Sequence, residues 1–301
     1  MSSRLVSIFL FLLFTSTFGW TQTATCSNWN VFQLPSSWDP PYLIDYGGIN
    51  RWGTIVGSAT PNNSYISGFV RYIGGGFSTF KAPQSSPASS TFFTRRNNSG
   101  VTVGYYGDSS YRVHGIVVSG SKSVTVDYPG AFYTMLYGIN NWGTIVGVHY
   151  DGQGGSGYPL GFKLKDGKFT RIYYPDSILT VPNSINDKAA IVGYYWDQKM
   201  VQHGFILENG IYKTLDNPKN NPQFTPNGNE LKDINGSGTI VGYYYVGQTI
   251  YSFLYSNGVF KDILPENGSN TVVEAINGYG DVLGITDLSS GKEPFFTARC
   301  H

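Results

Sequence analysis

The stretch Gly138 to Gly147, GINNWGTIVG, decides the fold because the chain repeats it. It recurs at Gly48 to Gly57 as GINRWGTIVG and at Asp233 to Gly242 as DINGSGTIVG. Each copy joins an Asn and two or three turn formers to a β-branched pair that ends in Gly, which is typical of a β-hairpin. A ring of such Asn residues could instead bind a cation or a sugar, but turn formation is the favoured interpretation. Weaker copies begin at Arg96, Ser184 and Ala275.

Two further landmarks define the repeat around each hairpin. A short strand such as the one at Gly204-Phe205 follows the hairpin, and the next strand ends in proline. With four strand signals every ~45 residues, six units predict an all-β, six-bladed β-propeller, and a β-solenoid is the structural alternative. The prolines are Pro35, Pro83, Pro129, Pro175, Pro218 and Pro265, and the Asn landmarks are Asn50, Asn98, Asn140, Asn186, Asn235 and Asn277.

The order of strands at the two ends predicts how the ring closes. The chain begins with a strand that leads to Pro35, which is the kind that ends a unit. It finishes with the third strand of the sixth unit, Phe295 to Arg299. We therefore expect the N-terminal strand to complete the last blade. Cys26 and Cys300 both map to the turn that is missing between these strands, so a disulfide would hold the ring shut.

The N-terminal residues predict export. Arg4 is followed by about ten apolar residues and then by small and polar ones, as in a secretory signal that is too short to span a membrane. Cleavage after Gly19 or Ala24 fits this pattern. We assign residues 1–24 to the signal peptide and residues 26–301 to one β-propeller domain. No other apolar run is long enough for a transmembrane segment, and we expect a secreted, extracellular monomer.

Composition and motifs exclude several classes of function. Charged residues make up 13% of the chain and the net charge is +1, so there is no electrostatic footprint for nucleic acid or for an anionic membrane. The sequence contains no zinc-protease, P-loop, CxxC or nucleophile-elbow motif. We therefore expect no cofactor, no metal and no catalytic residues, and we favour a role other than that of an enzyme.

The repeat resembles the extracellular repeat family named for its His-Ala-Phe (HAF) motif. In this chain the GIN-x-x-G-x-IVG-Y hairpin is followed by His203-Gly204-Phe205 in one unit and by His114-Gly115-Ile116 in another. Other units replace the His. The resemblance covers roughly Gly48 to Phe296 and implies a secreted, propeller-like repeat protein. It implies no particular activity and no catalytic residues.

The main candidate for a ligand site lies on the first strand of each unit. In a propeller this strand usually lines the central channel. The position three residues before each Asn landmark varies and is mostly polar, whereas its neighbours are constrained, so specificity could be built there. The structural alternative is a position that simply faces solvent where the strand begins. The residues at this position are Gly47, Arg95, Tyr137, Asn183, Lys232 and Glu274.

Aromatic residues after the second strand of the units form another candidate site. Tyr106, Tyr195, Trp196 and Tyr244 could stack on a sugar or contact a peptide, because such rings combine apolar faces with polar tips. Alternate residues of a strand point to opposite faces, so these side chains could equally pack between blades. Packing is the slightly favoured interpretation.

Three functions follow from these features. The favoured one is a secreted binding or scaffold module for a carbohydrate or protein ligand. The alternative is an extracellular glycoside hydrolase or lyase that uses Glu274 together with Asp45 or Asp233, since glycosidases work with pairs of carboxylates. The third is a purely structural envelope protein, which would have no pocket with convergent polar groups.

Overall fold

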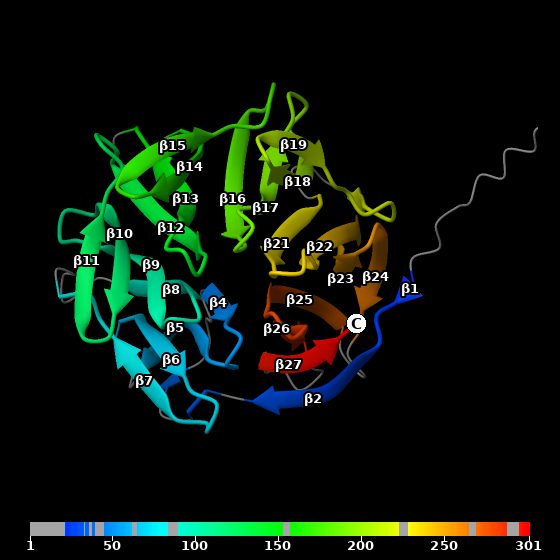
Figure 1. The fold of residues 1–301 in the computed structure, drawn as a ribbon, viewed down its shortest axis with the longest axis horizontal. Coiled ribbons are helices and arrows are strands. Elements are labelled where there is room, and N and C mark those ends of the chain that lie inside the picture. Colours follow the sequence, from blue (N-terminus) through cyan, green and yellow to red (C-terminus); the bar gives the residue numbers. More distant parts are fainter. Residues whose placement is uncertain are drawn as a thin grey trace, which may run out of the picture.

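The computed structural model describes ten ranges of the chain, and all of their regular structure is β. Six four-stranded blades stand around a central axis (Figure 1), which confirms the predicted six-bladed β-propeller. Among the described residues no helix is long and apolar enough to cross a membrane. Most of the predicted signal peptide lies outside the description. The described ranges are 22–32, 34–35, 38–39, 45–61, 65–83, 90–152, 157–222, 228–264, 269–287 and 295–301.

Each blade is an antiparallel sheet with strands a, b, c and d, counted from the axis outward. Blade one contains β4 (Asp45–Ile49), β5 (Ile55–Pro61), β6 (Ser67–Arg71) and β7 (Phe77–Phe80). Blade two contains β8 (Thr91–Arg96), β9 (Val101–Gly107), β10 (Val113–Ser119) and β11 (Lys122–Val126). Blade three contains β12 (Tyr133–Ile139), β13 (Ile145–Tyr150), β14 (Leu160–Lys165) and β15 (Lys168–Ile172).

Blades four and five repeat this arrangement, and three shorter strands extend the sheets. Blade four contains β16 (Leu179–Ile185), β17 (Ile191–Trp196), β18 (Gln202–Glu208) and β19 (Ile211–Thr214). Blade five contains β21 (Glu230–Ile234), β22 (Ile240–Gly247), β23 (Thr249–Ser256) and β24 (Val259–Ile263). The added strands, which pair with β24, β5 and β22 in turn, are β1 (Gln22–Thr23), β3 (Trp38–Asp39) and β20 (Asn221–Pro222).

The sixth blade combines an early strand of the chain with the last three strands. Its strands b and c, β26 (Asp281–Asp287) and β27 (Phe295–Cys300), follow strand a, β25 (Ser269–Ile276). Its outermost strand is β2 (Cys26–Phe32), which pairs antiparallel with β27 and closes the ring (Figure 1). Cys26 lies opposite Cys300 in this pairing and forms a disulfide with it. Both the closure and the disulfide agree with the expectation from the sequence.

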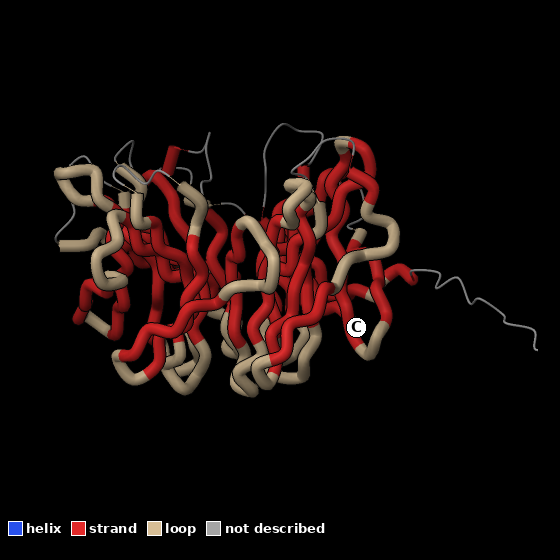
Figure 2. Tube along the Cα trace, turned by 90° about the horizontal axis from the view of Figure 1, so that it is seen from above, coloured by secondary structure: helices blue, strands red, loops and turns tan. Residues whose placement is uncertain are grey.

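The strands run between two faces of a short, wide cylinder (Figure 2). Because strands a and b, and likewise c and d, are joined by short hairpins, all these turns lie at the same face. We call it the turn face. The described parts of the b-to-c and d-to-a connections lie at the opposite face.

Six buried Asn side chains join the blades at the turn face. As predicted, each Asn bonds its own turn: the Asn140 Oδ1 accepts the N–H groups of Trp142 at 3.1 Å and Thr144 at 2.9 Å. The Nδ2 of each Asn also donates to the backbone carbonyl of the equivalent Asn in the next blade. In blade two the ring member is Asn97, so counting from Asn98 was wrong by one residue. The six bonds run Asn50–Asn97, Asn97–Asn140, Asn140–Asn186, Asn186–Asn235, Asn235–Asn277 and Asn277–Asn50, at 3.1 to 3.3 Å.

A β-bulge in strand a explains the glycine that ends the repeated motif. In β16 the pairing shifts between Pro182 and Ser184, which leaves Asn183 as the extra residue. The Val181 carbonyl oxygen is thereby pushed toward Gly193 of β17. A Cβ on Gly193 would lie 2.0 Å from this oxygen, so only glycine fits. The terminal glycine of the motif therefore makes room for the bulge, whereas the sequence suggested only turn formation.

The two histidines of the HAF-like motif are held between carboxylates. His203 Nδ1 lies 2.6 Å from Asp216 Oδ2, and its Nε2 lies 3.6 Å from Asp197 Oδ2. His114 is held in the same way by Asp127 and Asp108. Both histidines thus support the structure of their blades.

The His203 contacts predict a pH dependence of stability. The hydrogen bond that His203 donates to Asp216 raises the pKa of His203 above its ordinary value of about 6.5, and burial opposes this rise. The stabilisation that protonated His203 gains from its carboxylate partners is therefore complete below the ordinary pKa and is lost as the pH rises through the raised pKa. Between pH 6 and 8, urea melts should show a steeper fall in unfolding free energy for the wild type than for His203→Gln. His301→Gln, at the exposed C-terminus, should keep the wild-type slope. Equal slopes in wild type and His203→Gln would refute this role.

Candidate functional site

A pocket of about 190 Å³ lies in the central channel. The bulge in strand a turns its extra residue toward the axis, and five blades contribute such a residue to the pocket wall. Bulges commonly re-aim side chains at functional sites in this way. The five bulge residues are Thr94, Tyr137, Asn183, Lys232 and Glu274.

The structure brings most of the predicted ring together in this pocket. Tyr137, Asn183, Lys232 and Glu274 line it from the expected position of their blades, and Arg95 lines it as well. The remaining residues of the predicted ring behave differently. In blade two the ring Asn is Asn97, so the residue three positions before it is Thr94 and not Arg95. Gly47, in blade one, offers its carbonyl oxygen to Arg95 Nη1 at 2.8 Å.

Arg95 crosses the channel and divides it in two. From blade two, its Nη2 reaches the carbonyl oxygens of Lys232 at 3.2 Å and Glu274 at 3.3 Å, in blades five and six. The same nitrogen lies 3.3 Å from Asp233 Oδ1. Arg95 lines both the central pocket and a second cavity of about 370 Å³ beside the Asn ring. Its guanidinium is therefore the floor that separates the central pocket from the turn face.

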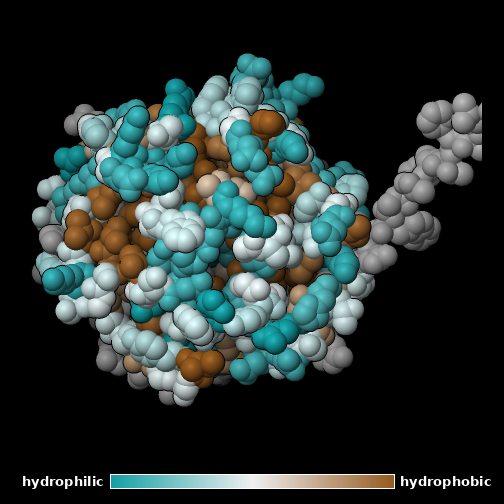
Figure 3. Space-filling model, in the orientation of Figure 1, coloured by the Kyte–Doolittle hydropathy of each residue, from teal (hydrophilic) through white to brown (hydrophobic). Residues whose placement is uncertain are grey.

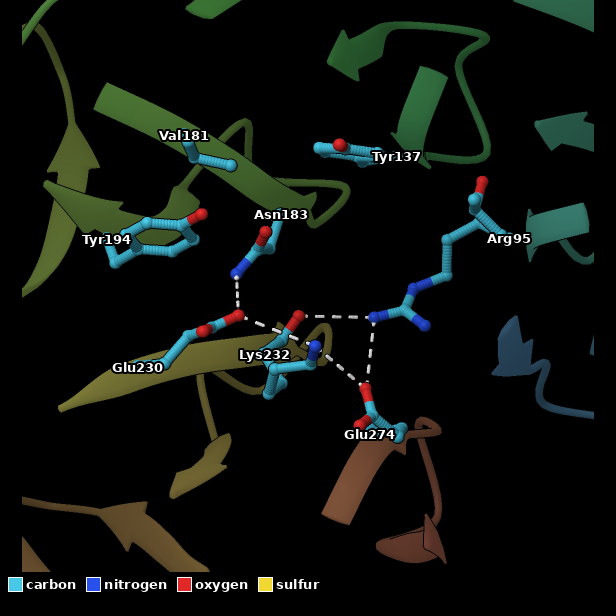
Figure 4. Close-up of a pocket in the computed structure, with 9 residues that line it drawn as sticks. Arg95, Tyr137, Val181, Asn183, Tyr194, Glu230, Lys232 and Glu274 are labelled. Atoms are coloured by element: carbon cyan, nitrogen blue, oxygen red, sulfur yellow. Dashed lines mark hydrogen bonds and ion pairs between the residues drawn. The ribbon is translucent and has the colours of Figure 1, made fainter. Parts of the chain in front are cut away.

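Lys232 lies between two glutamates from neighbouring blades (Figure 4). Its Nζ is 2.9 Å from Glu274 Oε2 and 3.4 Å from Glu230 Oε1. Glu230 also accepts hydrogen bonds from Asn183 Nδ2 at 3.0 Å and from the Tyr243 hydroxyl at 2.5 Å. The two glutamates balance the charges of Lys232 and Arg95, so the lining as a whole is polar but carries no net charge.

The wall facing Lys232 is partly aromatic. Tyr194 and Tyr137 lie there with Val181, across the pocket from Lys232 and Glu274 (Figure 4). Burial raises the pKa of Tyr194 well above its ordinary value, and the nearby Glu230 adds to the effect. The Tyr194 hydroxyl is therefore protonated at any physiological pH and can donate a hydrogen bond. The pocket thus offers donors, acceptors and ring faces together.

Sequence reasoning missed four residues of this pocket, one of which is the apolar Val181. Glu230 precedes Lys232 by two positions, and the alternation of side chains along a strand could have indicated it. Thr94 was missed because the Asn landmark of blade two was placed one residue late. Tyr194 belongs to strand b and follows the motif glycine directly; no signal in the sequence distinguishes it from the other tyrosines there.

The other candidate residues lie elsewhere. Tyr106, Tyr195 and Tyr244 are buried in the core between blades, where each hydroxyl is hydrogen-bonded, and none lines the central pocket. Trp196 is half-buried, and its Nε1 donates to Gln202 Oε1 at 3.2 Å. The packing interpretation therefore describes these aromatics.

Asp233, one of the two acids proposed as partners of Glu274, is engaged by other groups. Asp233 is buried, and its carboxylate accepts bonds from the Ser184 hydroxyl and from the backbone N–H groups of Ile234 and Ile276. The side chain of Asp45 lies outside the description. Nor does any group of three or more His, Cys, Asp or Glu side chains in the described ranges have a metal-binding arrangement.

No family model matches the sequence, and no curated protein matches it. The fold, however, is similar to that of solved β-propellers. A fungal lectin from Aleuria aurantia, described as a six-bladed β-propeller with a novel mode of fucose recognition, has a TM-score of 0.53 at 11% identity, covering 87% of this chain and 93% of the lectin. AofleA from Arthrobotrys oligospora has a TM-score of 0.54 at 13% identity, covering 92% and 86%. At these identities the similarity establishes the fold, a six-bladed β-propeller.

Proposed function

We propose that the protein is a carbohydrate-binding module and that its central pocket takes a neutral sugar. The observation that carries the proposal is the pocket lining. Side chains from five blades converge on one small space, their charges cancel, and they offer donors and acceptors beside two tyrosine rings. Sugar hydroxyls need such donors and acceptors, and the apolar face of a sugar ring suits an aromatic wall.

The fold supports the same class of ligand. The Aleuria aurantia lectin, which shares the six-bladed architecture, is described by its mode of fucose recognition. The pocket of this chain is small, at about 190 Å³. We therefore infer that it takes a single sugar residue or the end of a glycan chain.

The positions of the charges favour binding over hydrolysis. In a glycosidase, two carboxyl groups flank the bond that is broken. Here the ammonium group of Lys232 occupies the space between Glu230 and Glu274. The Asp233 carboxylate accepts hydrogen bonds from a hydroxyl and two backbone N–H groups. The hydrolase alternative is accordingly the weaker proposal.

We also propose that the protein is secreted and belongs to the HAF repeat family. The apolar N-terminal segment and the Cys26–Cys300 disulfide support export, because disulfides persist in oxidising compartments. Ala24 is buried and its N–H donates to the Asp262 carbonyl oxygen, next to the pairing of β1 with β24. These contacts favour signal cleavage after Gly19 over cleavage after Ala24.

Substitutions in the pocket should weaken sugar binding. Lys232→Gln and Glu274→Gln each remove a charge that can bond a hydroxyl, and a hydrogen bond to a charged group contributes about 1.5–3 kcal/mol. We expect each to reduce affinity about ten- to hundredfold for the sugar that binds most strongly on a glycan array, measured by isothermal titration calorimetry. Glu208→Gln, on an exposed strand end, is the matched control and should bind normally. An array without any bound glycan, or unchanged affinity in both pocket variants, would rule out the central pocket as a sugar site.

A further inference from the structure

The turn face carries two exposed tryptophans at equivalent positions of the repeat. Trp52 and Trp142 each follow a ring Asn by two residues, in blades one and three. Their side chains are 57% and 74% exposed. Tryptophan is highly buried on average and is enriched at binding interfaces, so two exposed tryptophans on one face indicate a binding surface. Neither residue lines the central pocket, and Arg95 separates that pocket from the turn face.

Both indoles are held in place by the neighbouring blade. Trp52 Nε1 donates to the Asn98 carbonyl oxygen at 3.1 Å, and Trp142 Nε1 donates to the Asp187 carbonyl oxygen at 3.0 Å. Each ring therefore bridges two blades with its single polar atom already bonded. The Arg51 guanidinium lies over the Trp52 ring, 4.8 Å from its centre. The ring surface that stays exposed on each indole is held in one orientation, so a ligand binds it without the entropy cost of ordering it.

A second chain of hydrogen bonds supports these rings. The backbone N–H of Arg51 donates to Asn98 Oδ1 at 3.0 Å, that of Asn98 to Asn141 Oδ1 at 2.8 Å, and that of Asn141 to Asp187 Oδ1 at 2.8 Å. These residues directly follow the Asn ring and lie beside the indoles. Hydrophilic side chains surround the axis in the space-filling view (Figure 3), in keeping with this polar frame. The aromatic surfaces are thus set in a rigid, polar surround.

The size and surroundings of the two rings indicate the class of partner. A stable protein interface buries about 800 Å² on each partner and has a contiguous apolar core. Two separate indoles divided by Asn and Asp side chains offer no such core. A sugar ring, in contrast, covers one indole with its C–H face while its hydroxyls bond the polar groups around it.

We propose that Trp52 and Trp142 are two carbohydrate-stacking platforms, which bind the pyranose rings of a polysaccharide or of a clustered glycan. Because the platforms belong to blades one and three of the same face, one extended or repeating ligand can engage both. Simultaneous binding raises the overall affinity above that of either platform alone. The proposal concerns a surface distinct from the central pocket and does not depend on that pocket binding a sugar.

The test is native affinity electrophoresis in gels that contain hydroxyethyl cellulose, arabinogalactan, fucosylated xyloglucan or no polysaccharide. We expect at least one polysaccharide to retard the wild type. Trp52→Ala and Trp142→Ala should each weaken binding up to about tenfold, and the double variant should migrate as in the gel without polysaccharide. Phenylalanine at either position keeps a ring and should restore most of the retardation. Thermal melts of every variant establish that it is folded.

Two controls separate this proposal from the function of the central pocket. Tyr158→Ala removes an exposed aromatic from the opposite face and should be retarded like the wild type. In a Lys232→Gln background, which changes the central pocket, the tryptophan substitutions should still reduce the retardation. Retardation that is lost in Lys232→Gln but kept in the double tryptophan variant would place the site in the pocket and overturn the platforms. Absence of retardation in all three gels would overturn them as well.

Discussion

Replacing Asn140 with Asp is expected to lower the free energy of unfolding by about 2–4 kcal/mol. Asp keeps the oxygen that accepts the N–H groups of Trp142 and Thr144. It replaces the Nδ2 donor with a second oxygen, which then faces the Asn186 carbonyl across a distance that is now 3.1 Å. A buried acceptor is thereby left facing another acceptor, and a bond between blades three and four is lost.

Urea unfolding of the wild type, Asn140→Asp and a matched control measures this effect. Asn257 is a suitable control, because it also lies in a hairpin turn, with φ 52°, but its side chain is exposed. Asn257→Asp should change the unfolding free energy by no more than about 0.5 kcal/mol. If both substitutions had equally small effects, the ring of Asn residues would not be what joins the blades.

Removing the disulfide is expected to cost about 2–5 kcal/mol. Cys26 and Cys300 are separated by 274 residues, and the loop-entropy model assigns a cross-link of this length a contribution near the upper end of that range. In the double variant Cys26→Ser, Cys300→Ser, the pairing of β2 with β27 and the stacking of Phe32 on Phe295 at 5.3 Å remain. We therefore expect the ring to stay closed but to open at a lower temperature.

A peptide map without reductant and thermal melts with and without dithiothreitol provide the measurement. The map should contain the Cys26–Cys300 cross-link, and dithiothreitol should lower the melting temperature of the wild type by roughly 5–15 °C. The serine double variant should melt at the reduced wild-type temperature whether or not the reductant is present. Free thiols together with an unchanged melting temperature would mean that the cysteines do not hold the ring closed.

The fold could be predicted from the sequence because each blade carries the same local signals. An Asn turn and a proline recur in every unit, a β-branched pair recurs in five of the six, and the unpaired strands at the two ends imply the closure through β2 and β27. The bonds between blades could not be predicted, because they join residues more than 40 positions apart. Asn140 shows the difference: its Oδ1 bonds within the turn followed from residue type, but its Nδ2 bond to Asn186 did not.

The composition of the central pocket was predicted in part. Counting from the Asn landmark located Tyr137, Asn183, Lys232 and Glu274, because the spacing between bulge and turn is constant along these strands. The ion pairs around Lys232 depend on how neighbouring blades face one another, which a repeat pattern does not encode. Trp52 and Trp142 were visible within the repeated motif, but their exposure depends on the packing of adjacent turns.

The most direct test of the carbohydrate-binding function is a crystal structure of the protein with the sugar that binds most strongly on a glycan array. We expect electron density for one sugar residue in the central channel, in contact with Lys232 and Glu274 and beside Tyr194. A sugar bound only outside the channel, or crystals in which that sugar is absent at saturating concentration, would contradict the assignment of the central pocket as the binding site.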